Sequence, residues 1–213
     1  MLASAWIAGA GLGAEAHRRD EYLQAARIAV DPDVVRIELD LTAGIAVADR
    51  VIADIDRDRD GDISPGEASA HAEVVRQAIG LDVDGRPVAV TLATRRYPAL
   101  AAIRSGEGPI RLELIGYLPP MSGGTHHLRY RNAHRADIGV YLANALVPSS
   151  ALIAIEGQRR DIAQRELVID YTLRTERRRS GLGLLVASTV VAVLVFAALF
   201  WRRGRQARSR LPS

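Results

Sequence analysis

The chain has 213 residues, contains no cysteine, and carries 28 basic and 25 acidic side chains, for a formal net charge of +3. The absence of cysteine excludes a disulfide framework and a thiolate metal site. Between residues 17 and 180, acidic and basic side chains are nearly equal in number. We therefore expect no clustered basic face of the kind that binds nucleic acid.

Residues 1–16 have features of a secretory signal peptide. Leu2 to Ala14 are apolar or small, and Ala14-Glu15-Ala16 has the small-x-small form of a cleavage site before His17. No basic residue precedes the apolar run, and the alternative interpretation is a short buried helix or a disordered terminus. With a signal peptide, the domain that follows is periplasmic or extracellular; without one, it is cytosolic.

Alternation of apolar and polar residues predicts β-strands through most of residues 17–176. In the first expected strand, Val35, Ile37, Leu39 and Leu41 alternate with polar residues. Further strands are expected at 88–92, 110–114, 128–131, 140–147, 151–156 and 167–173, with a hairpin-type turn at Asp84-Gly85. The runs 140–147 and 151–156 are largely apolar, which is typical of strands covered on both faces. The pattern predicts a mainly β domain, an antiparallel β-sandwich, with a helical insertion at 42–80 after the first strand.

Residues 56–67 match the calcium-binding EF-hand pattern D-x-[DN]-x-[DN]-G-x5-E at every fixed position. Gly61 occupies the position where such a loop turns sharply. The pattern assigns carboxylate ligands at loop positions 1, 3, 5 and 12, a backbone carbonyl at 7, and a direct or water-mediated ligand at 9. The expected Ca²⁺ ligands are therefore Asp56, Asp58, Asp60, Asp62, Ser64 and Glu67. The alternative is an acidic surface turn in contact with solvent.

Helices are expected on both sides of this loop. The entering helix is predicted from apolar residues at helical spacing, which are Ile45, Ala48, Val51, Ile52 and Ile55. Ser64-Pro65-Gly66-Glu67 has the form of a capping box with proline at the first helical position. The exiting helix then places Ala68, Ala72, Val75 and Ile79 on one stripe.

Residues 181–201 contain no charged side chain and end in Phe200-Trp201. A helix of this length reaches about 31 Å, which matches a hydrocarbon core of about 30 Å. A basic juxtamembrane segment at 177–180 precedes it, and an arginine-rich tail at 202–213 follows. Because both flanks are basic, the positive-inside rule favours a cytoplasmic tail only weakly. We expect a single-pass, type I protein of the plasma (inner) membrane that contacts lipid through this helix; without a signal peptide, the span is a tail anchor.

Several short motifs occur in the order found in a known family. They are His17-Arg18-Arg19-Asp20-Glu21-Tyr22, the acidic loop, Val83-Asp84-Gly85, Gly106-Glu107-Gly108, His127 to Asn132 and Tyr141 to Pro148. Together they resemble a family of bacterial extracytoplasmic EF-hand proteins. A similar domain precedes the membrane part of some nickel/cobalt permeases of the hydrogenase- and urease-accessory type. The resemblance implies a membrane or periplasmic protein partner.

The histidines offer a second, weaker metal hypothesis. Cleavage after Ala16 would leave His17 with an amine and an imidazole that could chelate Ni²⁺ or Cu²⁺ together. His126, His127 and His134 cluster in sequence, but on a strand His126 and His127 face opposite ways. His71 lies at the edge of the exiting helix's apolar stripe, where a packed or hydrogen-bonded role is expected. None of them has a zinc-type spacing.

No catalytic constellation is present in the sequence. There is no G-x-S-x-G motif, no cysteine nucleophile, and no carboxylate pair separate from the acidic loop. We therefore expect that the protein is not an enzyme. Two functions remain: a calcium-binding, membrane-anchored binding or scaffold module, or an accessory that binds nickel, cobalt or copper for a neighbouring metal transporter.

Overall fold

The computed structural model describes residues 20–175. The predicted signal peptide at 1–16, the juxtamembrane segment at 177–180, the transmembrane helix at 181–201 and the tail at 202–213 all lie outside these residues. Among the residues described, no helix is both long enough and apolar enough to cross a membrane.

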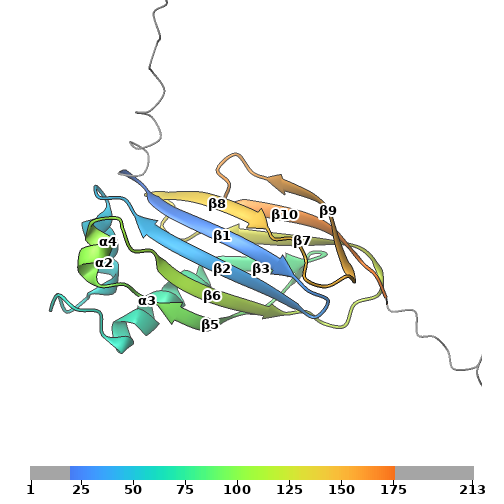
Figure 1. Cartoon of the computed structure of the whole chain (residues 1–213), viewed down its shortest axis with the longest axis horizontal. Coiled ribbons are helices and arrows are strands. Elements are labelled where there is room, and N and C mark those ends of the chain that lie inside the picture. The colour runs from blue at the N-terminus through green and yellow to red at the C-terminus, as the bar shows by residue number, and fades with distance from the viewer. Residues whose placement is uncertain (1–19, 176–213) are drawn as a thin grey trace, which may run out of the picture. The chain divides into compact units, whose positions relative to one another are not determined.

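Within residues 20–175, ten strands form two five-stranded sheets, and three short helices accompany them (Figure 1). The first sheet has the order β5-β6-β2-β1-β8, with bounds β5 Val90–Arg96, β6 Ile110–Tyr117, β2 Val34–Ala43, β1 Tyr22–Val30 and β8 Gly139–Ala145. The second has the order β4-β3-β7-β10-β9, with bounds β4 Arg86–Pro87, β3 Ile79–Val83, β7 Gly124–Asn132, β10 Glu166–Leu173 and β9 Ile153–Arg160. The helices are α2 Ala48–Ile55, α3 Pro65–Gln77 and α4 Leu100–Arg104. The mainly β class predicted from the sequence is confirmed.

Both sheets contribute to one hydrophobic core. Alternate residues of the central strands are buried, so that Ile37 of β2, Leu114 of β6 and Ile169 of β10 are at most 1% exposed. Gly116 of β6 marks a close approach between the sheets. A Cβ there would lie 2.7 Å from Cδ2 of Leu81 on β3, so any larger residue would require the Leu81 side chain to shift.

The prediction of a purely antiparallel arrangement is wrong for one pair of strands. β8 runs parallel to β1, with Tyr22 opposite Gly139 and Ile28 opposite Ala145. Contacts between distant segments fix this position: the Tyr22 amide donates to the Ile138 carbonyl at 2.9 Å, and Gln24 Nε2 donates to the His134 carbonyl at 2.8 Å. Alternation along a strand carries no information about such a pairing.

Other boundaries also differ from the expectation. β1 was not predicted, so the helical insertion follows the second strand. Ile45 is 56% exposed and lies in the turn before α2, whereas Ile79 begins β3. Nor are the two apolar runs covered on both faces: β8 and β9 are outer strands, and Val140 and Leu142 are substantially exposed.

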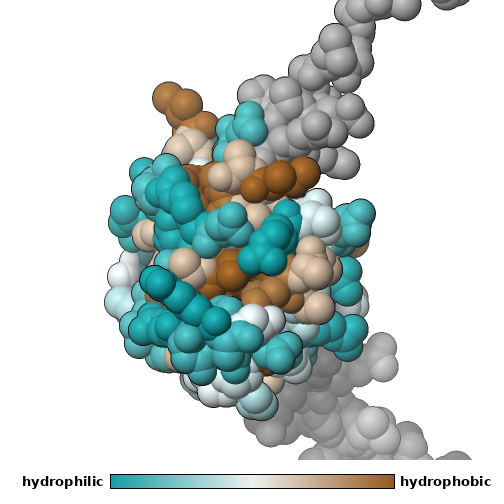
Figure 2. All heavy atoms as spheres, turned by 90° about the vertical axis from the view of Figure 1, so that its left-hand side faces the viewer, coloured by the Kyte–Doolittle hydropathy of each residue, from teal (hydrophilic) through white to brown (hydrophobic). Residues whose placement is uncertain are grey.

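The three helices lie together at one end of the two sheets (Figure 1). Viewed from this end, the surface is mostly hydrophilic, and hydrophobic residues show between the hydrophilic ones near its centre (Figure 2). Ion pairs fasten α2 to its neighbours. Arg50 pairs with Asp137 at 2.7 Å, Asp54 pairs with Arg135, and Asp49 pairs with Arg104 of α4 at 3.1 Å.

Candidate metal centre

The acidic loop lies between α2 and α3, and both of its ends are fixed by helix termini. Asp56 is the C-cap of α2, and its N–H donates to the Ile52 carbonyl at 2.8 Å. Ser64 is the N-cap of α3, where it forms the predicted capping box with Glu67, and Pro65 begins the helix. The helix–loop–helix arrangement expected around residues 56–67 is therefore present.

The backbone of the loop turns so that Asp56, Asp58 and Asp60 each accept a hydrogen bond from a backbone N–H of the same loop. Gly61 has φ +89°, in the left-handed region where glycine carries the least strain, as its loop position predicts. Asp56 Oδ2 accepts a hydrogen bond from the Gly61 N–H at 3.2 Å. Asp58 Oδ1 accepts from Asp60 N–H at 3.2 Å, and Asp60 Oδ1 accepts from Asp62 N–H at 2.9 Å. Each of the three aspartates thus uses one carboxylate oxygen to hold the loop.

These hydrogen bonds bring three carboxylates together. One oxygen each from Asp56, Asp58 and Asp60 lies within 4.8 Å of the other two, and the group could hold a metal ion. Asp56 is only 6% exposed, and its Oδ1 is buried without a hydrogen-bond partner. A buried polar atom without a partner costs about 1–3 kcal/mol, and more when it is charged.

Within the described part of the chain, no cationic side chain forms an ion pair with this group of aspartates, although Arg57 and Arg59 lie in the same loop. Carboxylates this close repel one another, most strongly where burial lowers the effective dielectric constant. Oxygen ligands with unbalanced negative charge fit a hard cation.

The other three predicted ligands lie outside this group of aspartates. Glu67 bridges the loop: Oε1 accepts from the Arg57 N–H at 2.8 Å, while Oε2 accepts from the Ser64 N–H at 3.0 Å and from Ser64 Oγ at 2.8 Å. The hydrogen bonds from Ser64, followed by that from Arg57, lower the pKa of the Glu67 carboxyl, so it is ionised at neutral pH. Asp62 lines an adjacent cavity of about 640 Å³ beside α4.

A pair of buried histidines lies next to the helix–loop–helix. His71 of α3 and His134, in the loop between β7 and β8, are 3% and 5% exposed, with ring centroids 5.7 Å apart. Tyr97 Oη lies 2.7 Å from His71 Nδ1, so His71 is packed and hydrogen-bonded as predicted. Burial lowers the pKa of His71 to about 3 and that of His134 to about 4. The sequence alone did not predict this contact, because His71 and His134 are far apart in the chain and only the tertiary structure brings them together.

The remaining histidines of the described residues also have structural partners. His126 and His127 point to opposite faces of β7, as predicted. His126 is buried, and its Nδ1 is hydrogen-bonded to Asp84 at 2.8 Å. His127 is exposed, and its Nδ1 is hydrogen-bonded to Asp170 at 2.6 Å. In residues 20–175, no histidine belongs to a metal-capable group of three. His17 lies outside the described residues.

No protein-family model matches the chain, and no curated protein matches it in sequence. The resemblance to bacterial extracytoplasmic EF-hand proteins thus stays a prediction.

Proposed function

We propose that residues 56–67 bind one calcium ion in the manner of an EF-hand, and that the ion stabilises the helical end of an exported, membrane-anchored β-sandwich. The observation that carries this proposal is the buried Asp56 Oδ1, which has no hydrogen-bond partner and lies beside the carboxylates of Asp58 and Asp60. A cation at this point would satisfy the orphaned oxygen and relieve the repulsion between the three carboxylates.

The number and kind of donors favour Ca²⁺ over Mg²⁺. Side-chain oxygens of Asp56, Asp58 and Asp60 would be joined by the Asp62 carbonyl, Ser64 and both oxygens of Glu67. About seven oxygen ligands in a flexible loop suit Ca²⁺, whereas Mg²⁺ requires a smaller octahedral shell and keeps several waters. Glu67 already spans the loop from Arg57 to Ser64, which supports its assignment as the closing ligand.

The surroundings of the loop support a structural role for the ion. Outside the loop, α2 is fastened by Arg50–Asp137 and Asp54–Arg135, and α3 by the hydrogen bond between His71 and Tyr97. Both helices also bury an apolar face in the core, including Val51 and Ile55 of α2 and Val75 of α3, and packed helices have little freedom to reorient when the loop binds an ion. Calcium would therefore order the loop between two fixed helices and would not open a groove between them.

The proposed location rests on the signal peptide and the transmembrane helix that the sequence predicts. A signal peptide at 1–16 and a lipid-spanning helix at 181–201 would place the β domain outside the plasma membrane, where a membrane or periplasmic protein would be its partner. Calcium is abundant outside cells, and extracellular EF-type modules bind it with dissociation constants of about 10⁻⁴ to 10⁻³ M. A site of this affinity would be occupied as a structural element.

Isothermal titration of the full-length chain in detergent micelles tests the proposal. We expect one calcium per chain with a dissociation constant of about 10⁻⁴ to 10⁻³ M, and no calcium heat in the double variant Asp56→Ala, Glu67→Ala. The matched control Asp33→Ala, Glu107→Ala also removes one aspartate and one glutamate, but from exposed positions outside the loop. It should bind calcium as the unmodified chain does. Absence of heat in the unmodified chain, or equal heat in the loop variant, would overturn the proposal.

The same titration with Ni²⁺, Co²⁺ and Cu²⁺ tests the transporter-accessory alternative. Tight binding of one of these ions that is lost in His17→Ala would favour the accessory function. Binding of calcium alone would favour the structural site.

A further inference from the structure

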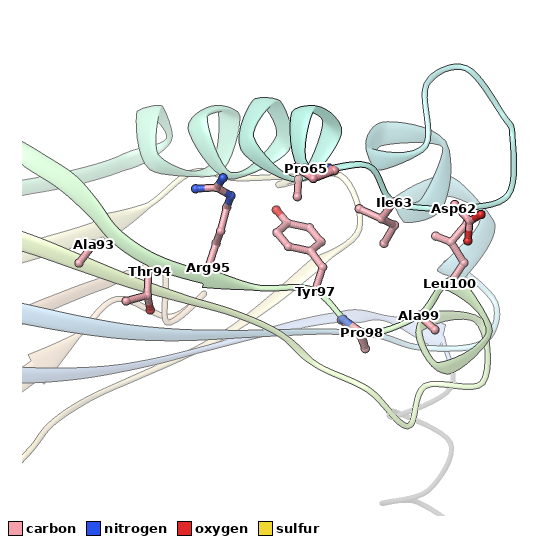
Figure 3. Close-up of a pocket in the computed structure, with 11 residues that line it drawn as sticks. Asp62, Ile63, Pro65, Ala93, Thr94, Arg95, Tyr97, Pro98, Ala99 and Leu100 are labelled. Atoms are coloured by element: carbon pink, nitrogen blue, oxygen red, sulfur yellow. The ribbon is translucent and has the colours of Figure 1, made fainter.

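The cavity of about 640 Å³ beside the acidic loop is a groove between a helix and the edge of a sheet. One wall is formed by the end of the loop and the first turns of α3, and includes Ile63, Pro65 and Ala68; the other is the end of β5. Tyr97 and Arg95 extend from the β5 segment towards α3, and Leu100 of α4 closes the end of the groove (Figure 3).

The wall formed by β5 has unused backbone hydrogen-bonding capacity. β5 is the outer strand of its sheet and pairs only with β6, so alternate N–H and C=O groups point away from the sheet. A register shift between Leu92 and Thr94 leaves Ala93 without a partner residue on β6. Among residues 20–175, one side chain hydrogen-bonds to the backbone of β5, at the start of the strand, where Arg76 Nη1 of α3 donates to the Val90 carbonyl at 2.9 Å. The backbone of Ala93, Thr94 and Arg95, which line the groove, has no such contact within the described residues. At the opposite edge, side chains of β9 hydrogen-bond to β8: Arg160 Nε donates to the Ala143 carbonyl at 2.7 Å, and Gln158 Oε1 accepts from the Ala145 N–H at 3.1 Å.

The same register shift directs a basic side chain into the groove. Arg95 is opposite Leu112, a core residue, and therefore lies on the inner face of the sheet, whereas Arg96 is opposite Arg111 on the outer face. Arg95 is nevertheless exposed, and within residues 20–175 it has no carboxylate or hydrogen-bond partner. An arginine in this position favours an occupant that carries a carboxylate.

We propose that an extended segment of a partner protein adds to the outer edge of β5 in this groove, placing an apolar side chain between Ile63 and Leu100 and a carboxylate on Arg95. Backbone hydrogen bonds to the strand edge would supply affinity, and the two side-chain contacts would supply specificity. A second copy of this chain is disfavoured as the occupant, because antiparallel pairing of two β5 edges centred on the groove would bring their Arg95 side chains close together.

Calcium should strengthen this docking. Asp62 and Ile63 occupy loop positions 7 and 8 and line the groove, and the Asp62 carbonyl is one of the proposed calcium ligands. Ordering of the loop would therefore fix one wall of the groove before the peptide arrives, which lowers the cost of binding. This calcium dependence rests on the proposed function, whereas the docking on β5 does not.

Selection from a random eight-residue peptide library displayed on phage, against the full-length chain in detergent and calcium, tests the docking. We expect enrichment of peptides that combine β-branched or aromatic residues with aspartate or glutamate. Synthetic copies should bind about tenfold or more weakly to Arg95→Glu. Arg96→Glu is the matched control, because it reverses the same charge on the neighbouring residue but faces away from the groove, and it should bind as the unmodified chain does.

N-methylation of the peptides distinguishes strand addition from simple charge attraction. Methylating alternate amides that face β5 should abolish binding, and methylating the intervening amides should leave it unchanged. Failure to enrich any peptide, equal binding to Arg95→Glu and Arg96→Glu, or equal tolerance of both methylation patterns would overturn the docking proposal.

Calcium titration of the same samples separates this proposal from the proposed function. Peptide binding that persists in a chain without calcium heat would support docking on β5 and contradict the calcium site. A normal calcium heat without peptide binding would overturn the docking alone.

Discussion

Saturating calcium is expected to raise the midpoint of thermal unfolding of the full-length chain by about 5–10 °C. A ligand that binds only the folded state, at 100 times its dissociation constant, stabilises that state by about 2.7 kcal/mol. For a domain of this size, each kcal/mol corresponds to about 2–4 °C. The ion would act on the loop that joins α2 to α3, where Asp56 Oδ1 is buried without a partner. Calorimetry at several calcium concentrations measures this shift.

Asp56→Asn provides the control for this prediction. The substitution keeps the shape of the side chain, and its amide oxygen can still accept the Gly61 N–H, but it removes one of the three clustered charges. We expect the variant to be at least as stable as the unmodified chain without calcium, because repulsion from Asp58 and Asp60 is reduced. Its calcium-induced shift should be much smaller. An equal shift in both proteins would show that calcium acts elsewhere.

Acidification from pH 7.5 to pH 5 is expected to destabilise the fold by about 4 kcal/mol through His71 and His134. Burial lowers the pKa of these side chains to about 3 and about 4, compared with about 6.5 in the unfolded chain. The unfolded state therefore takes up protons first as the pH falls. The stabilisation is complete above pH 6.5 and is lost progressively as the pH falls towards 4 and then 3, at about 1.4 kcal/mol per pH unit for each histidine.

Comparison with His71→Gln, His134→Gln isolates this pair from other titrating groups. His126 acts in the opposite direction, because its hydrogen bond to Asp84 raises its pKa, but it is present in both proteins. Denaturant unfolding between pH 4.5 and 7.5 should give a clearly smaller slope of stability against pH in the double variant. If that variant does not fold, NMR titration of the unmodified chain serves instead: both imidazoles should stay neutral at pH 5. Protonation of either near pH 6.5 would contradict the prediction.

Local patterns in the sequence predicted the features that depend only on neighbouring residues, namely strands, caps and turns. Alternation located β2, β6 and β10, because each has one face in the core and one in solvent. The capping box at Ser64 and the turn at Gly61 were predictable for the same reason, since each depends on a few neighbouring residues. The three-aspartate group also follows from spacing within one loop.

Features that depend on distant contacts were not predictable in this way. β1 was missed because two of its inward positions are Gln24 and Ala26, which interrupt the apolar alternation. Gln24 is buried because its side chain reaches the His134 carbonyl and accepts from Asn132 Nδ2. The parallel pairing of β8, the contact between His71 and His134, and the groove beside β5 likewise arise from segments that are far apart in the chain.

Anomalous diffraction from crystals of the chain grown in about 10 mM calcium, well above the dissociation constant expected for such modules, would test the central claim most directly. We predict one calcium peak in the loop, within about 2.3–2.6 Å of oxygens from Asp56, Asp58, Asp60 and Glu67. A loop that holds no ion under these conditions, or a peak bound by other residues, would contradict the claim that residues 56–67 form the calcium site.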